Sequence, residues 1–80
     1  MKLTHFKQID AYNFALTFAN GETKQADLKD LIGLHVALDA LKTARIDPDW
    51  GCLEFNNGRV DIEPKTLYEF ASASDCQQAA

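Results

Sequence analysis

The sequence predicts an α+β domain in which antiparallel β-hairpins, arranged as a meander, pack with short α-helices in the approximate order β-β-β-α-α-β-β-α. Residues 12–18 alternate large apolar side chains with other residues, which is the period of a strand with one buried face. An Asn-Gly pair follows at residues 20–21 and recurs at 57–58, and such pairs supply the positive φ angles that tight hairpin turns need. Pro64 then precedes an apolar stripe with helical spacing. Eighty residues provide enough chain for one small domain of this kind.

The first three strands are expected at residues 3–9, 12–18 and 22–26. Asp10 and Ala11 turn the first strand back onto the second. In the next hairpin, a two-residue loop would place polar partners on the buried face, whereas a three-residue loop with a bulge pairs Phe14 with Ala26. Because a slip of one residue exchanges the two faces of a strand, we favour the pairing of Phe14 with Ala26.

Two helices are expected after this sheet. Asp27 is placed to cap a short helix over residues 28–32, and Gly33 can end that helix in a left-handed conformation. Residues 34–43 are predicted to form a second, amphipathic helix that covers the sheet. Its apolar stripe consists of leucines at i, i+4 and i+7, namely Leu34, Leu38 and Leu41.

The second half of the chain predicts another hairpin and a last helix. A short strand is expected to begin at Ile46, and residues 51–55 are expected to pair with 60–62 around the second Asn-Gly turn. Residues 64–71 are predicted to be helical, with an apolar stripe at i, i+3 and i+4.

The domain is expected to end with this helix. Residues 72–80 contain no large apolar side chain, so we expect a flexible C-terminal tail after a single domain that spans residues 1–71.

Charge is unevenly distributed along the chain. The formal net charge is −4, but residues 1–46 carry six basic and five acidic side chains (+1), whereas residues 47–80 carry two basic and seven acidic ones (−5). Because nucleic-acid binding depends on a surplus of Lys and Arg, no direct nucleic-acid binding is expected. The same deficit and the short apolar runs argue against membrane association. No secretory signal is recognisable, so a cytoplasmic location is expected.

The residue types that serve metal and cofactor chemistry are scattered. Cys52 and Cys76 lie 24 positions apart and are interpreted as two free thiols, with a disulfide or a shared metal as the alternatives. His5 and His35 have no third ligand at metal spacing, so no metal site is expected. The glycines are isolated and form no phosphate-binding loop, so no cofactor is expected.

Asp61 and Glu63 are the nearest approach to a pair of catalytic carboxylates, because two residues in a strand at this spacing face the same side. We favour a role at the start of the helix at Pro64, where carboxylates accept backbone N–H bonds. His35 and Asp39, at i and i+4, are interpreted as an ordinary exposed helix pair. No catalytic residue is therefore assigned, and the protein is not expected to be an enzyme.

Two motifs occur in order along the chain. The first is Tyr12-x-Phe14-x-Leu16-x-Phe18-x-Asn20-Gly21-Glu22, and the second is Asn57-Gly58-x-x-Asp61-Ile62-x-Pro64-x-x-Leu67-Tyr68. Together they resemble a small bacterial family, the domain of unknown function 2442, over residues 3 to 71. The resemblance implies a compact α+β fold. It also implies small proteins that are sometimes encoded beside a second small protein, as in toxin–antitoxin pairs, or fused ahead of a helix-turn-helix region. The family has no assigned catalytic residues, so none is carried over.

These observations favour a non-catalytic protein–protein interaction or regulatory module whose partner is another protein, such as the product of a neighbouring gene. Its acidic second half would complement a basic partner. The expected partner-binding residues are two aromatic anchors and four carboxylates: Trp50, Tyr68, Glu54, Asp61, Glu63 and Glu69. One alternative is a dimerising or ligand-sensing domain of a transcription regulator, acting as a homodimer through exposed sheet edges. A second alternative is a small enzyme that its motifs do not reveal.

Overall fold

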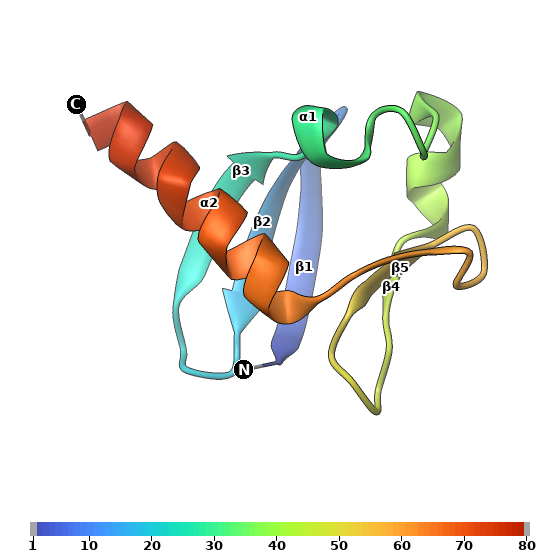
Figure 1. The fold of residues 1–80 in the computed structure, drawn as a ribbon, viewed down its shortest axis with the longest axis horizontal. Helices are drawn as coiled ribbons and strands as arrows, with labels where there is room; N and C mark the ends of the chain where they lie inside the picture. The colour runs from blue at the N-terminus through green and yellow to red at the C-terminus, as the bar shows by residue number, and fades with distance from the viewer. Residues whose placement is uncertain (1, 80) are drawn as a thin grey trace.

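The computed structural model describes residues 2–79, with side chains as far as residue 73, and shows two small antiparallel sheets packed with helices (Figure 1). The first sheet consists of β1 (Leu3–Asp10), β2 (Asn13–Phe18) and β3 (Thr23–Asp27). The second consists of β4 (Arg45–Ile46), β5 (Leu53–Phe55) and β6 (Val60–Ile62). The helices are α1 (Lys29–Ile32), the 3₁₀ helix η1 (Leu38–Thr43) and α2 (Pro64–Ala79). The predicted α+β class is confirmed, with β4 as the short strand expected at Ile46.

The first sheet has the predicted meander order and register. Phe14 pairs with Ala26, as the three-residue loop requires. This register turns Phe14, Leu16 and Phe18 to the same face, where all three are buried. On the opposite face the hydroxyls of Thr17 and Thr23 form a hydrogen bond across the strands, 2.9 Å long. The two-residue period of the sequence therefore becomes one apolar and one polar face.

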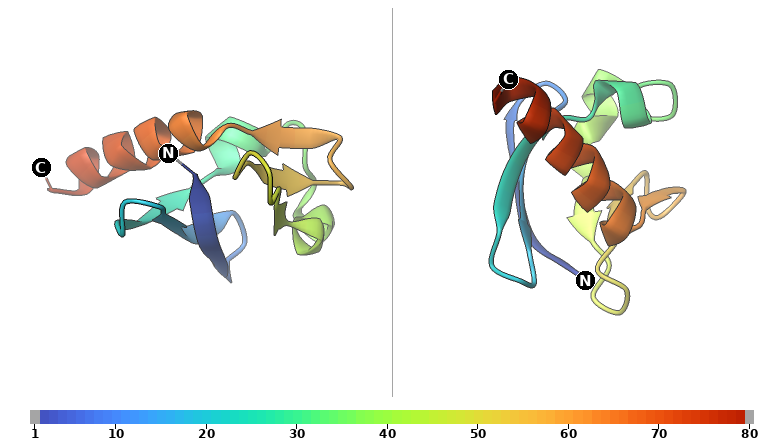
Figure 2. Two further views of the ribbon diagram at one scale, coloured as in Figure 1. Left: turned by 90° about the horizontal axis from the view of Figure 1, so that it is seen from below. Right: turned by 60° about the vertical axis from the view of Figure 1, so that its left-hand side comes forward.

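Helix α2 covers the apolar face of the first sheet, and the other face has no element of residues 2–79 upon it (Figure 2). Leu67 and Ala71 of α2 are fully buried in the core, as their spacing predicts. The ring of Tyr68 meets that of Phe18 edge to face at 5.2 Å between centroids. Phe14 makes a similar contact with Phe55 at 6.2 Å, and this contact joins the two sheets.

The predicted end of the last helix at residue 71 is wrong. Helix α2 begins at Pro64 as expected but continues to Ala79. No Gly or Pro follows residue 71, and the alanines and glutamines there are good helix formers, so nothing local stops the helix. The flexibility expected of residues 72–80 stays a prediction, and Ala80 lies outside the described residues.

The predicted amphipathic helix over residues 34–43 is also wrong. Its place is taken by a turn and then η1, and of the three leucines only Leu41 is buried, at 1% exposed. Leu34 is 98% exposed and Leu38 57%. Val36 is buried in their place, and the extended backbone of Ala37 breaks any continuous helix. Because no one helix contains both His35 and Asp39, the expected i, i+4 pair does not form.

The chain around α1 agrees with the sequence at its start and differs at its end. Asp27 Oδ1 accepts the backbone N–H of Lys29 at 3.0 Å, which confirms Asp27 as the capping side chain. Gly33 is not left-handed, because its φ of −59° and ψ of −28° continue the right-handed turn. The backbone carbonyl of Ile32 then accepts the N–H of Val36 at 2.8 Å, so the turn carries Val36 into the core.

The first residues of the chain hold the two sheets together. The Leu3 N–H donates to the Gly51 carbonyl at 3.1 Å, in the turn between β4 and β5. The Ala19 N–H donates to the Lys2 carbonyl at 2.8 Å, at the end of β2. Residues 2 and 3 are therefore bound to both sheets at once.

Tyr68 supplies a prediction about acid stability. Its hydroxyl donates to Glu22 Oε1 at 2.8 Å, which lowers the pKa of Glu22 and raises the pKa of Tyr68. A carboxyl whose pKa is lowered by folding stabilises the protein above its unfolded pKa, and this contribution is lost as the pH falls through the folded pKa. Tyr68→Phe is therefore expected to lower the free energy of unfolding more at pH 7 than at about pH 3 in urea titrations.

Tyr12→Phe is the matched control for this prediction, because the Tyr12 hydroxyl donates to the backbone carbonyl of Val36 and not to a carboxylate. Its effect on the free energy of unfolding is expected to be the same at both pH values. An equal loss at both pH values for Tyr68→Phe would contradict the linkage to Glu22.

Candidate functional site

The candidate site lies on the outer face of the second sheet. Leu53 pairs with Ile62, and both are buried in the core. Because side chains alternate along a strand, their neighbours point the other way. Four residues form this outer face. Glu54 lies in β5 and Cys52 directly before it, whereas Asp61 lies in β6 and Glu63 directly after it. The sheet thus gathers three carboxylates that are spread over ten positions of sequence.

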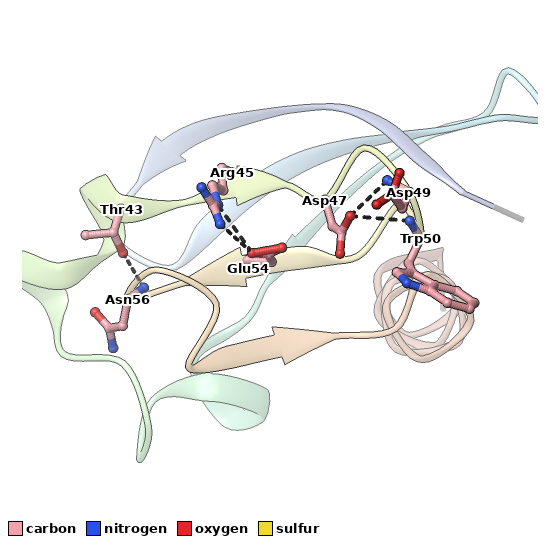
Figure 3. A network of polar contacts seen from close by, with 7 residues as sticks. All are labelled: Thr43, Arg45, Asp47, Asp49, Trp50, Glu54 and Asn56. Carbon is pink, nitrogen blue, oxygen red and sulfur yellow. Dashed lines mark hydrogen bonds and ion pairs between the residues drawn. The ribbon is translucent and has the colours of Figure 1, made fainter.

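Glu54 is neutralised within this face. It is only 8% exposed, and Arg45 Nε and Nη2 both donate to its Oε2 at 3.2 Å (Figure 3). Arg45 is its neighbour across the pairing of β4 with β5. A buried carboxylate needs such a partner, because an uncompensated charge in the interior is costly.

The turn between β4 and β5 presents Trp50 to solvent. Asp47 Oδ1 accepts the backbone N–H groups of Asp49 at 2.8 Å and Trp50 at 3.4 Å (Figure 3). The Asp47 carbonyl also accepts the N–H of Gly51 at 2.8 Å. These bonds fix the backbone of the turn, and the Trp50 side chain remains 73% exposed.

Trp50 borders an open depression of about 460 Å³, called here the Trp50 depression. It is lined by Asp47, Trp50, Cys52, Asp61, Glu63, Pro64 and Lys65. The carboxylates of Asp47, Asp61 and Glu63, the ammonium of Lys65 and the indole ring of Trp50 therefore line the same depression. Among the side chains that the structure describes, those of residues 2–73, no group of three or more His, Cys, Asp and Glu is arranged to hold a metal ion.

Cys52 places a thiol in the depression. It is a free thiol and is half-buried. Burial raises its pKa, and the charges of Asp61, Asp47, Glu63 and Glu54 raise it further. A thiol with a raised pKa stays protonated at neutral pH and is a poor nucleophile.

The structure brings together three of the six residues expected to bind a partner, namely Trp50, Asp61 and Glu63. Glu54 lies on the same sheet but is engaged by Arg45. Tyr68 and Glu69 belong to α2. Tyr68 is half-buried against Phe18 and bonded to Glu22, and Glu69 is exposed and does not line the Trp50 depression.

The other four lining residues, Asp47, Cys52, Pro64 and Lys65, were not among the partner-binding residues expected from the sequence. Cys52 could have been found by extending the pairing of Leu53 with Ile62 one residue outward, which brings Cys52 opposite Glu63. The Asp47 N–H donates to the Cys52 carbonyl at 2.9 Å, so Asp47 follows from the pairing of β4, a strand of two residues with little signal of its own.

A family model described as "Protein of unknown function (DUF2442)" matches residues 4–73. The chain belongs to the DUF2442 family. The match includes every residue that lines the Trp50 depression, so the depression is part of the DUF2442 domain itself. No curated protein and no solved structure shows significant similarity to this DUF2442 chain. Among residues 2–79, no helix combines the length and the apolar character that crossing a bilayer requires.

Proposed function

We propose that this DUF2442 chain is a non-catalytic interaction module that binds a basic segment of a partner protein in the Trp50 depression. The observation that carries the proposal is an indole ring, largely exposed, held by a fixed turn beside a depression with an acidic lining. The same proposal takes the product of a neighbouring gene as the partner. It also places the protein in the cytoplasm, where Cys52 stays a free thiol.

Trp50 is suited to be the anchor of such an interface. Tryptophan offers a large apolar surface at a small cost in side-chain entropy and is enriched among residues that dominate binding energy. Its ring face also attracts cations, arginine above all. Because Asp47 accepts the backbone N–H groups of Trp50 and Gly51, the backbone that carries the ring needs no rearrangement on binding.

The carboxylates of the Trp50 depression define the charge of the partner. Asp61 and Glu63 are exposed and line the depression, whereas Glu54 is already neutralised by Arg45. Opposite charges across an interface raise the rate of association and exclude partners of the wrong sign. The protonated thiol of Cys52 supports a binding role over a catalytic one, because it offers no nucleophile at neutral pH.

Trp50 is the one tryptophan of the chain, so its fluorescence reports directly on the proposed site. A capped arginine-glycine repeat peptide is expected to change this fluorescence in a saturable manner, and the effect should weaken as salt is added. A peptide with citrulline in place of arginine has the same shape without the charge and is expected to leave the emission unchanged. Asp61→Asn with Glu63→Gln should weaken binding by about tenfold.

Two further variants separate the depression from general acidity. Trp50→Ala, followed by calorimetry, is expected to lower the affinity by at least about tenfold. Glu69→Gln removes an exposed carboxylate outside the depression and should keep the affinity within about twofold. Equal binding of the arginine and citrulline peptides, or equal losses for Glu69→Gln and the double variant, would overturn the proposal.

A further inference from the structure

The turn between α1 and η1 exposes a leucine that neither the core nor the Trp50 depression uses. Among the residues with described side chains, the large apolar ones that are exposed are Ile9, Leu34, Leu38 and Trp50. Leu34 is the most exposed of them, at 98%. Figure 1 shows that a loop connects α1 to η1. Single exposed leucines are common on protein surfaces, so the case for a contact surface depends on what surrounds Leu34.

The backbone around Leu34 is firmly held. The Gly33 N–H donates to the Lys29 carbonyl at 2.7 Å, and the N–H groups of His35 and Val36 donate to the Ile32 carbonyl at 2.9 and 2.8 Å. The Tyr12 hydroxyl closes the turn with a bond of 2.6 Å to the Val36 carbonyl. Leu34 is therefore a knob on a held backbone, and docking it orders only its side chain.

A depression lies directly beside this knob. It measures about 310 Å³ and is lined by Tyr12, Lys29, Asp30, Gly33 and Leu34 itself. Apolar cavities of roughly 150 Å³ already accommodate a benzene ring, so this depression has room for a leucine side chain. Lys29 and Asp30 are both exposed, which gives its rim one charge of each sign.

We propose that a second copy of this chain docks here about a two-fold axis, with Leu34 of each copy inserted into the depression of the other. A two-fold interface uses the same patch on both copies, so a knob and a hole on one patch satisfy both copies at once. The rim is also complementary to itself, because Lys29 of each copy faces Asp30 of the other. The chain as a whole carries −4, and the patch is neutral, so two copies repel least at this surface.

The size of the patch sets the strength of the dimer. Stable dimers bury about 800 Å² on each partner. Such interfaces use about 20–30 residues on each side, whereas five residues line this depression. The dimer is therefore weak and forms in the range of hundreds of micromolar.

Sedimentation equilibrium of the full chain tests this dimer. From about 50 μM to about 1 mM, the average mass is expected to rise from 8.9 kDa toward twice that value. Leu34→Ser removes two apolar insertions per dimer and should weaken association by at least about tenfold. Leu38→Ser is the matched control, since Leu38 is exposed but does not line the depression, and it should change association by no more than about twofold.

Charge-reversal variants test the same dimer without changing its apolar surface. Lys29→Asp places like charges opposite each other and should weaken the dimer, whereas Lys29→Asp combined with Asp30→Lys exchanges the signs and should restore it. Circular dichroism checks that each variant is folded. The proposal is overturned if the chain stays monomeric at about 1 mM. It is also overturned if Leu34→Ser leaves the dimer intact, which is the result expected of a dimer that pairs through the sheet edges.

Discussion

Phe14→Ala is expected to lower the free energy of unfolding by about 3–5 kcal/mol, the cost of removing a large aromatic side chain from a closed core. Phe14 is fully buried, and its ring contacts Phe6 from β1 and Phe55 from the second sheet, each at 6.2 Å between centroids. The cavity therefore opens between the sheets. A domain of this size has a total stability near the low end of about 5–15 kcal/mol, so the variant is expected to be partly unfolded at 25 °C. Urea and thermal unfolding followed by circular dichroism measure the loss.

Phe6→Ala is the control for the position of Phe14 within the core. Phe6 contacts the same ring but is only half-buried, so its removal opens space toward solvent and not a closed cavity. It is expected to cost about half as much as Phe14→Ala. Equal losses for the two variants would show that Phe14 is not the residue that joins the sheets.

Gly51→Ala is expected to destabilise the fold by about 2–4 kcal/mol, through backbone strain and a steric clash together. Gly51 has a φ of +71°, and a Cβ there would lie 2.5 Å from Lys2 Cβ and 2.9 Å from Lys2 Cα. The backbone of Lys2 cannot easily retreat, because its carbonyl accepts the Ala19 N–H. The substitution should also disturb the neighbouring Trp50, which shifts the tryptophan emission of the folded protein.

Gly21→Ala separates the two causes. Gly21 has a φ of +89°, but a Cβ there meets no atom within 4 Å. It therefore carries the strain without the clash and is expected to cost only about 1–2 kcal/mol, with no change in Trp50 emission. If unfolding experiments gave the same loss for both glycines, the contact between Lys2 and Gly51 would contribute nothing to the joint between the sheets.

The hairpins, and the register of β2 with β3, were predictable because they depend on local chemistry. Asn-Gly turns and a two-residue period specify a strand, its turn and its buried face within about ten residues. The leucines of residues 34–41 misled the prediction because a helical period records only spacing. The burial of Val36 depends on Tyr12, which lies 24 positions away and binds the Val36 carbonyl. No periodicity within the segment contains that contact.

The candidate site was predictable in part for the same reason. Trp50, Asp61 and Glu63 are recognisable as an aromatic anchor and unpaired charges in an acidic half of the chain. Glu54 is recognisable as a charge, but its neutralisation by Arg45 follows from the pairing of β4 with β5. Since β4 consists of only two residues, that pairing is fixed by the tertiary structure and not by the propensity of the strand.

The position of α2 over the first sheet has a consequence for how the chain reaches its fold. β1, β2 and β3 are joined by short turns and can assemble as soon as residue 27 has left the ribosome, yet their apolar face is covered by α2, which begins 37 residues later, at Pro64. The contact of Tyr68 with Glu22 closes 46 residues of chain. Until α2 has been made, Phe14, Leu16 and Phe18 are therefore uncovered on the sheet, and exposed apolar surface of this kind is what makes nascent chains aggregate or recruit chaperones.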